Sequence, residues 1–290
     1  MPYFKKIIMN HLQRAARFKE LHYRPGIFVS ANAWDGASAR LLEKMGFDAI
    51  ATTSAGMAFG LGKPDKATEI SREDALKNAQ LILENTNLPV SADLMNGFGD
   101  SPEECAITIK LAAATGLSGA SIEDASGKPS QPIYDFELSV ERIKAAVKAV
   151  RVLNKPFMLT ARAENFLNGN FDLKDTIERL VAYAEAGADV LFAPGIKTLE
   201  DIETVVKALQ PKPINVLLNM EQQVYGLKQL EAIGVKRVSL GSGLFRLAYG
   251  YLQEAASHYL PKDKQAGFAP VVQHGEYNAL LSQEIKQETK

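Results

Sequence analysis

The feature that most constrains the fold is a regular alternation of short apolar segments with amphipathic helical stretches. Most of the apolar segments are bounded by turn residues and are apolar or small on both faces, as strands of a helix-covered parallel sheet must be. The helical stretches often end in glycine just before the next strand, as in "KMGFD", "EAGAD" and "AIGVK". The expected strands are residues 27–32, 48–53, 89–94, 119–124, 157–162, 189–194, 214–219 and 237–242.

Eight such units within about 250 residues predict an α/β fold, a (β/α)8 TIM barrel with extra helices at its N- and C-terminal ends. We expect residues 1–290 to form one domain, with a tail helix within 260–290. An open doubly wound sheet is the alternative, since it also alternates strands and helices. It is less favoured because no Gly-x-Gly-x-x-Gly turn follows the first strand.

Composition excludes several classes of protein. The chain has 33 basic and 34 acidic residues and a formal net charge of -1, which predicts no nucleic-acid partner and no membrane partner. Cys105 is the single cysteine, so an intrachain disulfide and a multi-cysteine zinc site are excluded, and we expect it to be buried and inert. The N-terminus predicts an amphipathic helix, not a signal peptide, and no apolar run approaches the roughly 20 residues of a membrane span. We therefore expect a cytoplasmic protein.

Polar and charged side chains follow the expected strands where each strand ends. In a barrel these ends share one mouth, where the chemistry of this fold is located. Asp93 and Glu123, on neighbouring strands, could hold Mg²⁺ or Mn²⁺, and Arg162 could bind a carboxylate or phosphate. A cation and an arginine together predict a site for a small anionic oxo-acid, in which the cation stabilises an enolate. The strand-end residues are Asn32, Trp34, Asp35, Thr53, Ser54, Asp93, Glu123, Asp124, Arg162, Glu164, Asn219 and Ser242.

Structural readings of the same residues remain open. Asp93 could cap a helix, and Glu123 with Asp124 could pair with Arg162 in a network that holds no metal. The segment "LGSGLFR" (240–246) could bind phosphate through its amides or simply form a turn.

Four segments carry a family resemblance: "NAWDGASARLLEKMGFDAIATTSAG", "SADLMNGFGD", "GASIEDASG" and "TARAENFLNG". In this order and spacing, over roughly 31–243, they resemble the isocitrate lyase/phosphoenolpyruvate mutase superfamily. The resemblance implies a (β/α)8 barrel that cleaves or forms C–C or P–C bonds next to a carboxylate through a Mg²⁺-stabilised enolate. It also implies a dimer of dimers with exchanged helices. We therefore expect a homo-oligomer, a dimer or tetramer, in which the tail within 260–290 is exchanged between subunits.

The resemblance also implies roles for individual residues. It makes Asp93 and Glu123 the metal ligands and Arg162 the catalytic arginine that binds the substrate. The remaining substrate-binding positions are Trp34, Thr53, Ser54 and Asn219, and the supporting acids behind the site are Asp65, Asp124 and Glu164.

The chain departs from the family pattern in two places. Ser91 replaces the first aspartate of the metal motif Asp-x-Asp-x-Gly-Tyr/Phe-Gly. The loop "ASGKPSQPIYDFE" (125–137) lacks the Lys-Lys/Arg-Cys-Gly-His sequence of isocitrate and methylisocitrate lyases, which disfavours those activities. Tyr134 and Lys128, in this loop, are the candidate catalytic acid–base groups.

The sequence therefore predicts a Mg²⁺- or Mn²⁺-dependent lyase or decarboxylase that cleaves a C–C bond of a small 2-oxo or 2-hydroxy carboxylate. One alternative is a phosphonopyruvate mutase or hydrolase acting on a P–C bond. The other is a barrel that has lost catalysis and binds a small acid.

Overall fold

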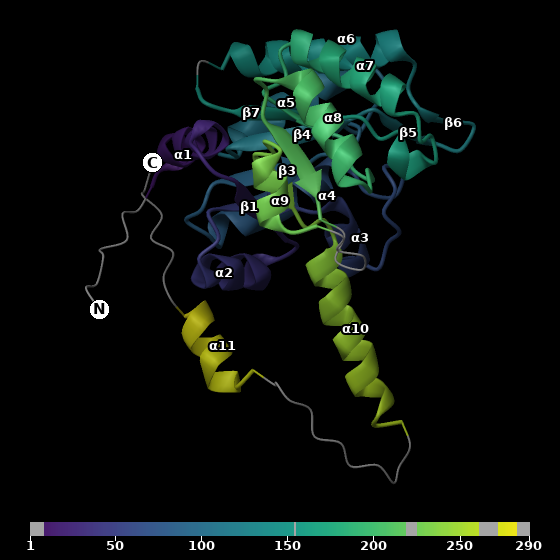
Figure 1. The fold of residues 1–290 in the computed structure, drawn as a ribbon. Coiled ribbons are helices and arrows are strands. Elements are labelled where there is room, and N and C mark those ends of the chain that lie inside the picture. Colours follow the sequence, from purple (N-terminus) through teal and green to yellow (C-terminus); the bar gives the residue numbers. More distant parts are fainter. Residues whose placement is uncertain (1–8, 154, 219–224, 261–271, 283–290) are drawn as a thin grey trace.

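Eight parallel strands close into a barrel in the computed structural model, which describes residues 9–153, 155–218, 225–260 and 272–282 (Figure 1). Around the barrel the strand order is β1-β10-β9-β8-β7-β4-β3-β2. The predicted (β/α)8 barrel is confirmed, and the open doubly wound sheet is excluded. The strands are β1 Phe28–Ala33, β2 Ala49–Thr52, β3 Val90–Asp93, β4 Gly119–Glu123, β7 Met158–Arg162, β8 Val190–Phe192, β9 Ile214–Leu217 and β10 Arg237–Ser239.

A small antiparallel hairpin interrupts the regular alternation after β4. Its strands are β5 (Ala125–Lys128) and β6 (Gln131–Ile133), which pair only with each other. The hairpin occupies the loop in which the sequence departs from the family pattern.

Helices surround the barrel, and most begin at a residue whose side chain caps them. Asp35, Ser71, Ser101 and Thr198 each accept a hydrogen bond from a backbone N–H of the first turn, which satisfies a donor that has no partner within the helix. The helices are α1 His11–Tyr23, α2 Gly36–Met45, α3 Ser54–Gly60, α4 Arg72–Glu84, α5 Pro102–Ala114, α6 Phe136–Arg151, the 3-10 helix η1 Phe166–Asn168, α7 Leu173–Glu185, α8 Leu199–Leu209, α9 Leu227–Ala232, α10 Gly243–Ser257 and α11 His274–Leu281.

The N-terminal helix α1 closes the lower end of the barrel. Phe18 and Leu21 of α1 are fully buried in an apolar cluster with Phe28, Met158 and Val190 at the start of three strands. The expected N-terminal helix is thereby confirmed. This cluster seals the end of the barrel opposite the carboxyl ends of the strands.

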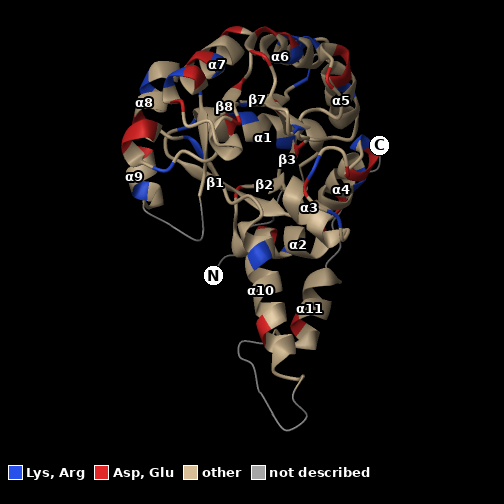
Figure 2. Cartoon of the chain, turned by 90° about the vertical axis from the view of Figure 1, so that its right-hand side faces the viewer, with Lys and Arg blue, Asp and Glu red and all other residues tan. Residues whose placement is uncertain are grey.

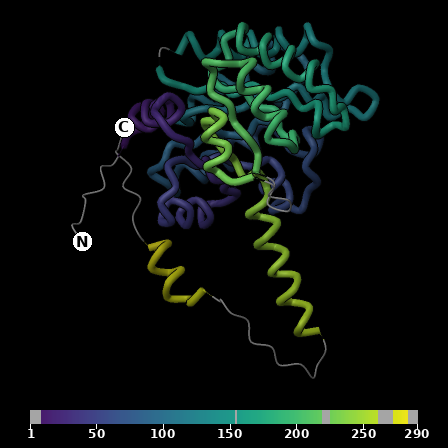
Figure 3. The backbone as a smooth tube through the Cα atoms, in the orientation of Figure 1, coloured from purple at the N-terminus to yellow at the C-terminus, as the bar shows by residue number. Residues whose placement is uncertain are grey.

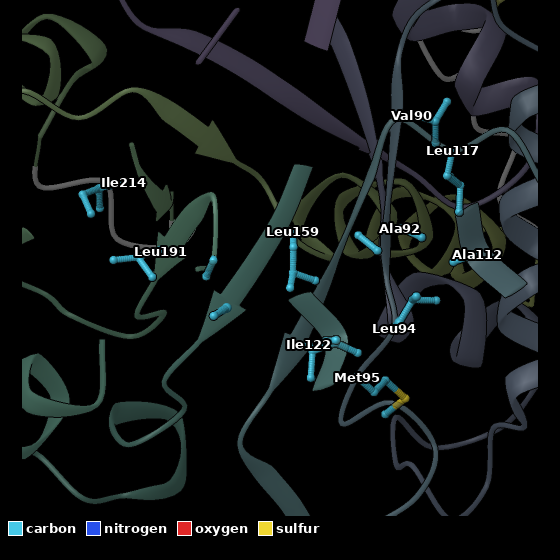
Figure 4. Packing of buried hydrophobic residues seen from close by; sticks show 14 of the residues in the cluster. Val90, Ala92, Leu94, Met95, Ala112, Leu117, Ile122, Leu159, Leu191 and Ile214 are labelled. Carbon is cyan, nitrogen blue, oxygen red and sulfur yellow. The ribbon is translucent and has the colours of Figure 1, made fainter. Parts of the chain in front are cut away.

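The strands alternate between an apolar outer face and a polar inner face. Outward residues such as Val90, Ile122 and Leu159 are buried in the main core beneath the helices (Figure 4). Inward residues line a cavity, and they include Ser30, Asn32, Ser91, Ser121, Asn215 and Ser239. The outer face is therefore apolar and the inner face mostly small, as expected, but the inner face is also polar. Small polar side chains leave space inside this barrel, where bulky aliphatic side chains would have filled it.

Helix α10 projects away from the barrel, as both the ribbon and the tube show (Figures 1 and 3). Its exposed apolar side chains are Leu247, Tyr249, Tyr251 and Leu252. Within the predicted tail, 260–290, the described part forms α11, which contacts α2, whereas 261–271 and 283–290 lie outside the described residues. The Lys, Arg, Asp and Glu residues lie mainly on the helices around the barrel (Figure 2). Within the described ranges, no helix is long and apolar enough to span a membrane.

Candidate active site

The carboxyl ends of three neighbouring strands bring Asp93, Glu123 and Arg162 together. These residues end β3, β4 and β7, and the register places Glu123 directly beside Arg162. Arg162 Nη1 lies 2.9 Å from Asp93 Oδ1 and 3.2 Å from Glu123 Oε2. All three side chains are mostly buried, so the interactions occur in a medium that screens charge far less than water does.

The acidic centre, formed by Asp93, Glu123, Glu164 and Arg162, holds more negative charge than Arg162 neutralises. Arg162 Nε also donates to Glu164 Oε1 at 2.8 Å, so three carboxylates share one guanidinium. Burial raises the pKa of Glu123 well above its ordinary value, and the charges of Glu164 and Asp93 add to that rise, while Arg162 opposes it. Burial also raises the pKa of Glu164. A bound cation would relieve this surplus of negative charge.

Asp124 belongs to a separate buried network behind the centre. Its carboxylate accepts hydrogen bonds from the Tyr183 hydroxyl at 2.6 Å, from Arg179 at 3.3 Å and from the Glu164 backbone N–H at 2.8 Å. Burial raises the pKa of Asp124, and these donors oppose the rise. The network fixes the backbone of Glu164 and thereby the carboxylate that contacts Arg162.

The first turn of α3 contributes to the other side of the centre. Thr53 is the N-cap of α3, and its hydroxyl accepts from the Gly56 backbone N–H at 3.2 Å. The Ser54 backbone N–H donates to Asp93 Oδ2 at 3.3 Å, and its hydroxyl bonds to Asp65 in the following loop. Asp65 is an exposed residue, and its pKa is raised by partial desolvation, followed by the charge of Asp93.

Trp34 and Asn32 are held by packing and hydrogen bonds at the same rim. The Trp34 ring lies edge-on to Phe245 of α10, with 5.4 Å between centroids. Asn32 Oδ1 accepts from the backbone N–H groups of Leu240 and Gly241 at 2.8 and 2.9 Å. Those two amides of the glycine-rich segment are therefore engaged inside the protein, which leaves them no hydrogen for a phosphate. Asn219, the remaining predicted substrate-binding residue, lies outside the described residues.

Tyr134 and Lys128 converge on Asp100 and do not line the cavity. The Tyr134 hydroxyl donates to Asp100 Oδ1 at 2.6 Å and accepts from Asn96 Nδ2 at 3.1 Å. Lys128 Nζ lies 2.5 Å from Asp100 Oδ2. Burial and the bond to Asp100 raise the pKa of Tyr134. These contacts join the β5–β6 hairpin to the loop after β3, and none of them supports the predicted acid–base role.

The loop after β3 is strained and clamped by an arginine that the sequence reading missed. Met95 and Phe98 have left-handed backbones, with φ of 50° and 60°, which is uncommon for residues other than glycine. Arg142, a fully buried residue of α6, donates to the backbone carbonyls of Asn96, Gly99 and Asp100. Sequence patterns could not identify Arg142, because it lies on a helix more than 40 residues away.

A cavity of about 90 Å³ extends from this centre into the barrel. Asp93 and Arg162 line the cavity at the carboxyl ends of their strands, and Ser91 and Ser121 line it within β3 and β4. Arg237, at the start of β10, also lines it. Sequence position does not identify Arg237, because it begins a strand and the expected site residues lie at the carboxyl ends of the strands.

The residues of the centre fit a divalent cation, with a reduced set of protein ligands. Asp93 and Glu123 offer hard oxygen donors and surplus negative charge, which suit Mg²⁺ or Mn²⁺ that keeps several water or substrate oxygens. Ser91, two residues before Asp93 on β3, lines the same cavity with a hydroxyl in place of a carboxylate. In the described part of the chain, no group of three or more His, Cys, Asp and Glu side chains is arranged to hold a metal ion. The cation would therefore rest on two carboxylates.

A closed barrel with carboxylates and an arginine at the carboxyl ends of its strands has its charged groups where TIM-barrel enzymes have their active sites. The family model of phosphoenolpyruvate phosphomutase matches residues 18–260, and the chain belongs to this family.

Relatives place the chain in the wider superfamily of lyases and mutases. It is 30% identical to 2-methylisocitrate lyase of Escherichia coli, over 79% of this chain and 77% of the relative. It is also 30% identical to 2,3-dimethylmalate lyase of Eubacterium barkeri, over 77% and 78%. A crystal structure from Burkholderia cenocepacia, given the provisional name lyase/mutase, aligns with a TM-score of 0.90 and 46% identity, over 94% and 97%. The predicted superfamily and an enzyme of the carbon–carbon lyase type are thereby confirmed.

Proposed function

We propose that the protein is a Mg²⁺- or Mn²⁺-dependent lyase that cleaves a C–C bond of a small 2-hydroxy or 2-oxo carboxylate. The observation that carries this proposal is the contact of Asp93 and Glu123 with one nitrogen of Arg162, at the mouth of a polar cavity. The relatives that act on methylisocitrate and dimethylmalate support the substrate class.

In this proposal Asp93 and Glu123 hold the cation. When bound, the cation supplies electrophilic stabilisation of the negative charge that develops on the substrate oxygen. Arg162 binds the substrate carboxylate through its planar fork of N–H donors. Glu164 orients Arg162 through its Nε, and Asp124 orients Glu164, so the guanidinium is fixed before the substrate arrives.

The rim residues complete the proposed substrate site. Thr53 and Ser54 begin α3 beside Asp93, and Ser54 links Asp93 to Asp65. Trp34 and Asn219 are proposed to enclose the substrate. Tyr134 and Lys128 stay candidate acid–base groups from the sequence alone, because both bond to Asp100 instead of lining the cavity.

Metal binding tests the proposal most directly. Titration with Mn²⁺ in the presence of oxalate, an enolate mimic, should show binding to the wild-type protein and weaker binding to Asp93→Asn. Substrate screening should then find cleavage among 2-hydroxy and 2-oxo dicarboxylates. Absence of Mn²⁺ binding to the folded wild-type protein would contradict the proposal and favour an Arg162 network that is purely structural.

A second candidate, P–C bond chemistry, is favoured by the matched family model. Turnover of phosphonopyruvate or phosphoenolpyruvate, with no cleavage of 2-hydroxy acids, would establish this alternative.

We also propose that the protein is a homo-oligomer. Support comes from helix α10, which projects away from the barrel (Figure 1) and carries the exposed apolar residues Leu247, Tyr251 and Leu252. A partner subunit that exchanges its tail would bury this surface.

A further inference from the structure

A cation that pairs with none of the acidic residues described by the structure lies inside the barrel. Arg237 is only 6% exposed and lines the same cavity as Arg162. Arg162 contacts three carboxylates, whereas Arg237 forms no ion pair with any described Asp or Glu. Burial, followed by the positive charge of Arg162, lowers the pKa of Arg237 to about 9, so it remains charged at neutral pH. A buried charge without a counter-ion is costly for a folded protein.

The hydrogen bonds of Arg237 leave part of its guanidinium free. Nε donates to Asn215 Oδ1 at 2.8 Å, and Nη2 donates to Thr160 Oγ1 at 3.1 Å. Nη1 lies 3.4 Å from His22 Nε2. His22 Nδ1 is 2.7 Å from the Phe18 carbonyl and therefore carries the ring hydrogen, so Nε2 accepts. Three of the five N–H groups of the guanidinium are used, and two have no acceptor among the described residues.

Ser30 provides a second, independent sign of a missing ligand. Its side chain is 1% exposed and lines the cavity, and its hydroxyl has no hydrogen-bond partner in the structure. Buried polar atoms in folded proteins are almost always bonded. The cavity, of about 90 Å³, has room for a monatomic anion together with a few water molecules, each of which needs roughly 10–15 Å³.

We propose that the floor of the barrel is a binding site for a small inorganic anion of the chloride class, held by the free N–H groups of Arg237 and the hydroxyl of Ser30. The anion would neutralise Arg237 and give both groups their missing partner. Water alone would satisfy the hydrogen bonds but would leave the positive charge of Arg237 without a counter-ion. The site shares the cavity with Asp93 and Arg162 but uses other residues than those proposed to hold the cation and the substrate, so anion binding can be tested without reference to the proposed function.

Bromide is the direct probe of this site. Crystals of the full chain grown in bromide should show an anomalous peak within about 3.5 Å of the Arg237 guanidinium, the distance of a hydrogen bond to a large anion. Density for water alone at this position, without an anomalous peak, would overturn the proposal.

Thermal unfolding gives a second test in solution. At equal ionic strength, chloride should raise the Tm of the wild-type protein by about 3 °C over gluconate, which is too large to enter, if chloride is near ten times its Kd. Arg237→Met should abolish this difference, and the matched surface variant Lys174→Met should keep it. Ser30→Ala, which retains the guanidinium, should need a severalfold higher chloride concentration and serves if Arg237→Met does not fold. An equal wild-type Tm in the two salts would contradict the proposal.

Discussion

At the scale of single residues, Arg162 connects the proposed chemistry to the geometry of the strands. Its Nη1 faces Asp93 and Glu123, while its Nε faces Glu164. A point charge could neutralise these acids, but only a planar fork can contact them and still align a carboxylate. Shape should therefore matter at this position as much as charge.

We predict that Arg162→Lys lowers kcat/KM by about 100-fold or more, because lysine keeps the charge but loses the bidentate geometry. Arg151→Lys is the matched control, since Arg151 is half exposed and bonds to Asp189 on the outside of the barrel. Steady-state kinetics of both variants is the measurement. Equal kcat/KM for Arg162→Lys and the wild type would remove Arg162 from the substrate site.

We predict that replacing Ser91 with an acidic residue raises the affinity for the metal ion. Ser91→Asp would add a third carboxylate beside Asp93 and should tighten Mn²⁺ binding by about tenfold, or about 1.4 kcal/mol. Ser239→Asp is the control, because Ser239 lines the same cavity on β10, away from β3 and β4 in the strand order. Calorimetric titration would decide, and an equal gain in both variants would argue against a cation at Asp93 and Glu123.

At the scale of elements, the β5–β6 hairpin is fixed to the loop after β3 through Asp100. Tyr134 contributes a buried hydrogen bond to this junction, and its ring lies against Arg142, with 4.1 Å from the guanidinium carbon to the ring centroid. The hairpin is therefore anchored from two sides.

Tyr134→Phe should lower the free energy of unfolding by about 1–2 kcal/mol, because Asp100 and Asn96 each lose a hydrogen bond. Turnover should change little, since the hydroxyl does not line the cavity. Urea unfolding and a pH–rate profile measure the two effects separately. Loss of one limb of the pH profile would instead support the acid–base role.

Helix α10 should carry the subunit contacts of the proposed oligomer. Leu252→Asn places a polar group on its exposed apolar surface and should reduce the mass measured by light scattering. Val152→Asn, at an exposed apolar position after α6, is the control that should leave the mass unchanged. A monomeric wild-type protein would contradict the prediction at once.

At the scale of the whole molecule, the lower end of the barrel depends on a neutral histidine. His22 is 1% exposed, and burial, followed by the charge of Arg237, lowers its pKa to about 3. The unfolded chain binds a proton at His22 near pH 6.5, whereas the folded protein does not. The contribution of neutral His22 to the free energy of unfolding is therefore fully present above pH 6.5 and is lost as the pH falls toward 3.

When the pH is lowered from 7 to 5.5, protonation of His22 in the unfolded chain should lower the free energy of unfolding by about 1 kcal/mol. His22→Gln removes the titration, so the pH dependence of its unfolding free energy should be flatter than that of the wild type by this amount. Urea unfolding of both proteins at both pH values measures this difference. The buried acids contribute equally to the wild type and the variant, so their contribution cancels. Parallel pH dependences would show that His22 takes up its proton equally in the folded and unfolded states and would contradict the lowered pKa.

The sequence by itself determined the barrel and the position of its acidic centre. Each strand carries its residues in alternation, and parallel strands bring their carboxyl ends to one mouth, so Asp93, Glu123 and Arg162 had to be neighbours once the barrel closed. Gly46 closes α2 in a left-handed conformation, as the repeated glycine endings predicted.

Only the tertiary structure decided which side chains meet across elements. Tyr134 and Lys128 turn to Asp100 because the hairpin packs on a loop about 30 residues away, and no local pattern encodes that contact. Arg237 begins a strand, where sequence position suggests no function, yet its long side chain reaches into the cavity beneath Arg162. Local periodicity fixes the face of a strand, whereas the partner of a long side chain depends on long-range packing.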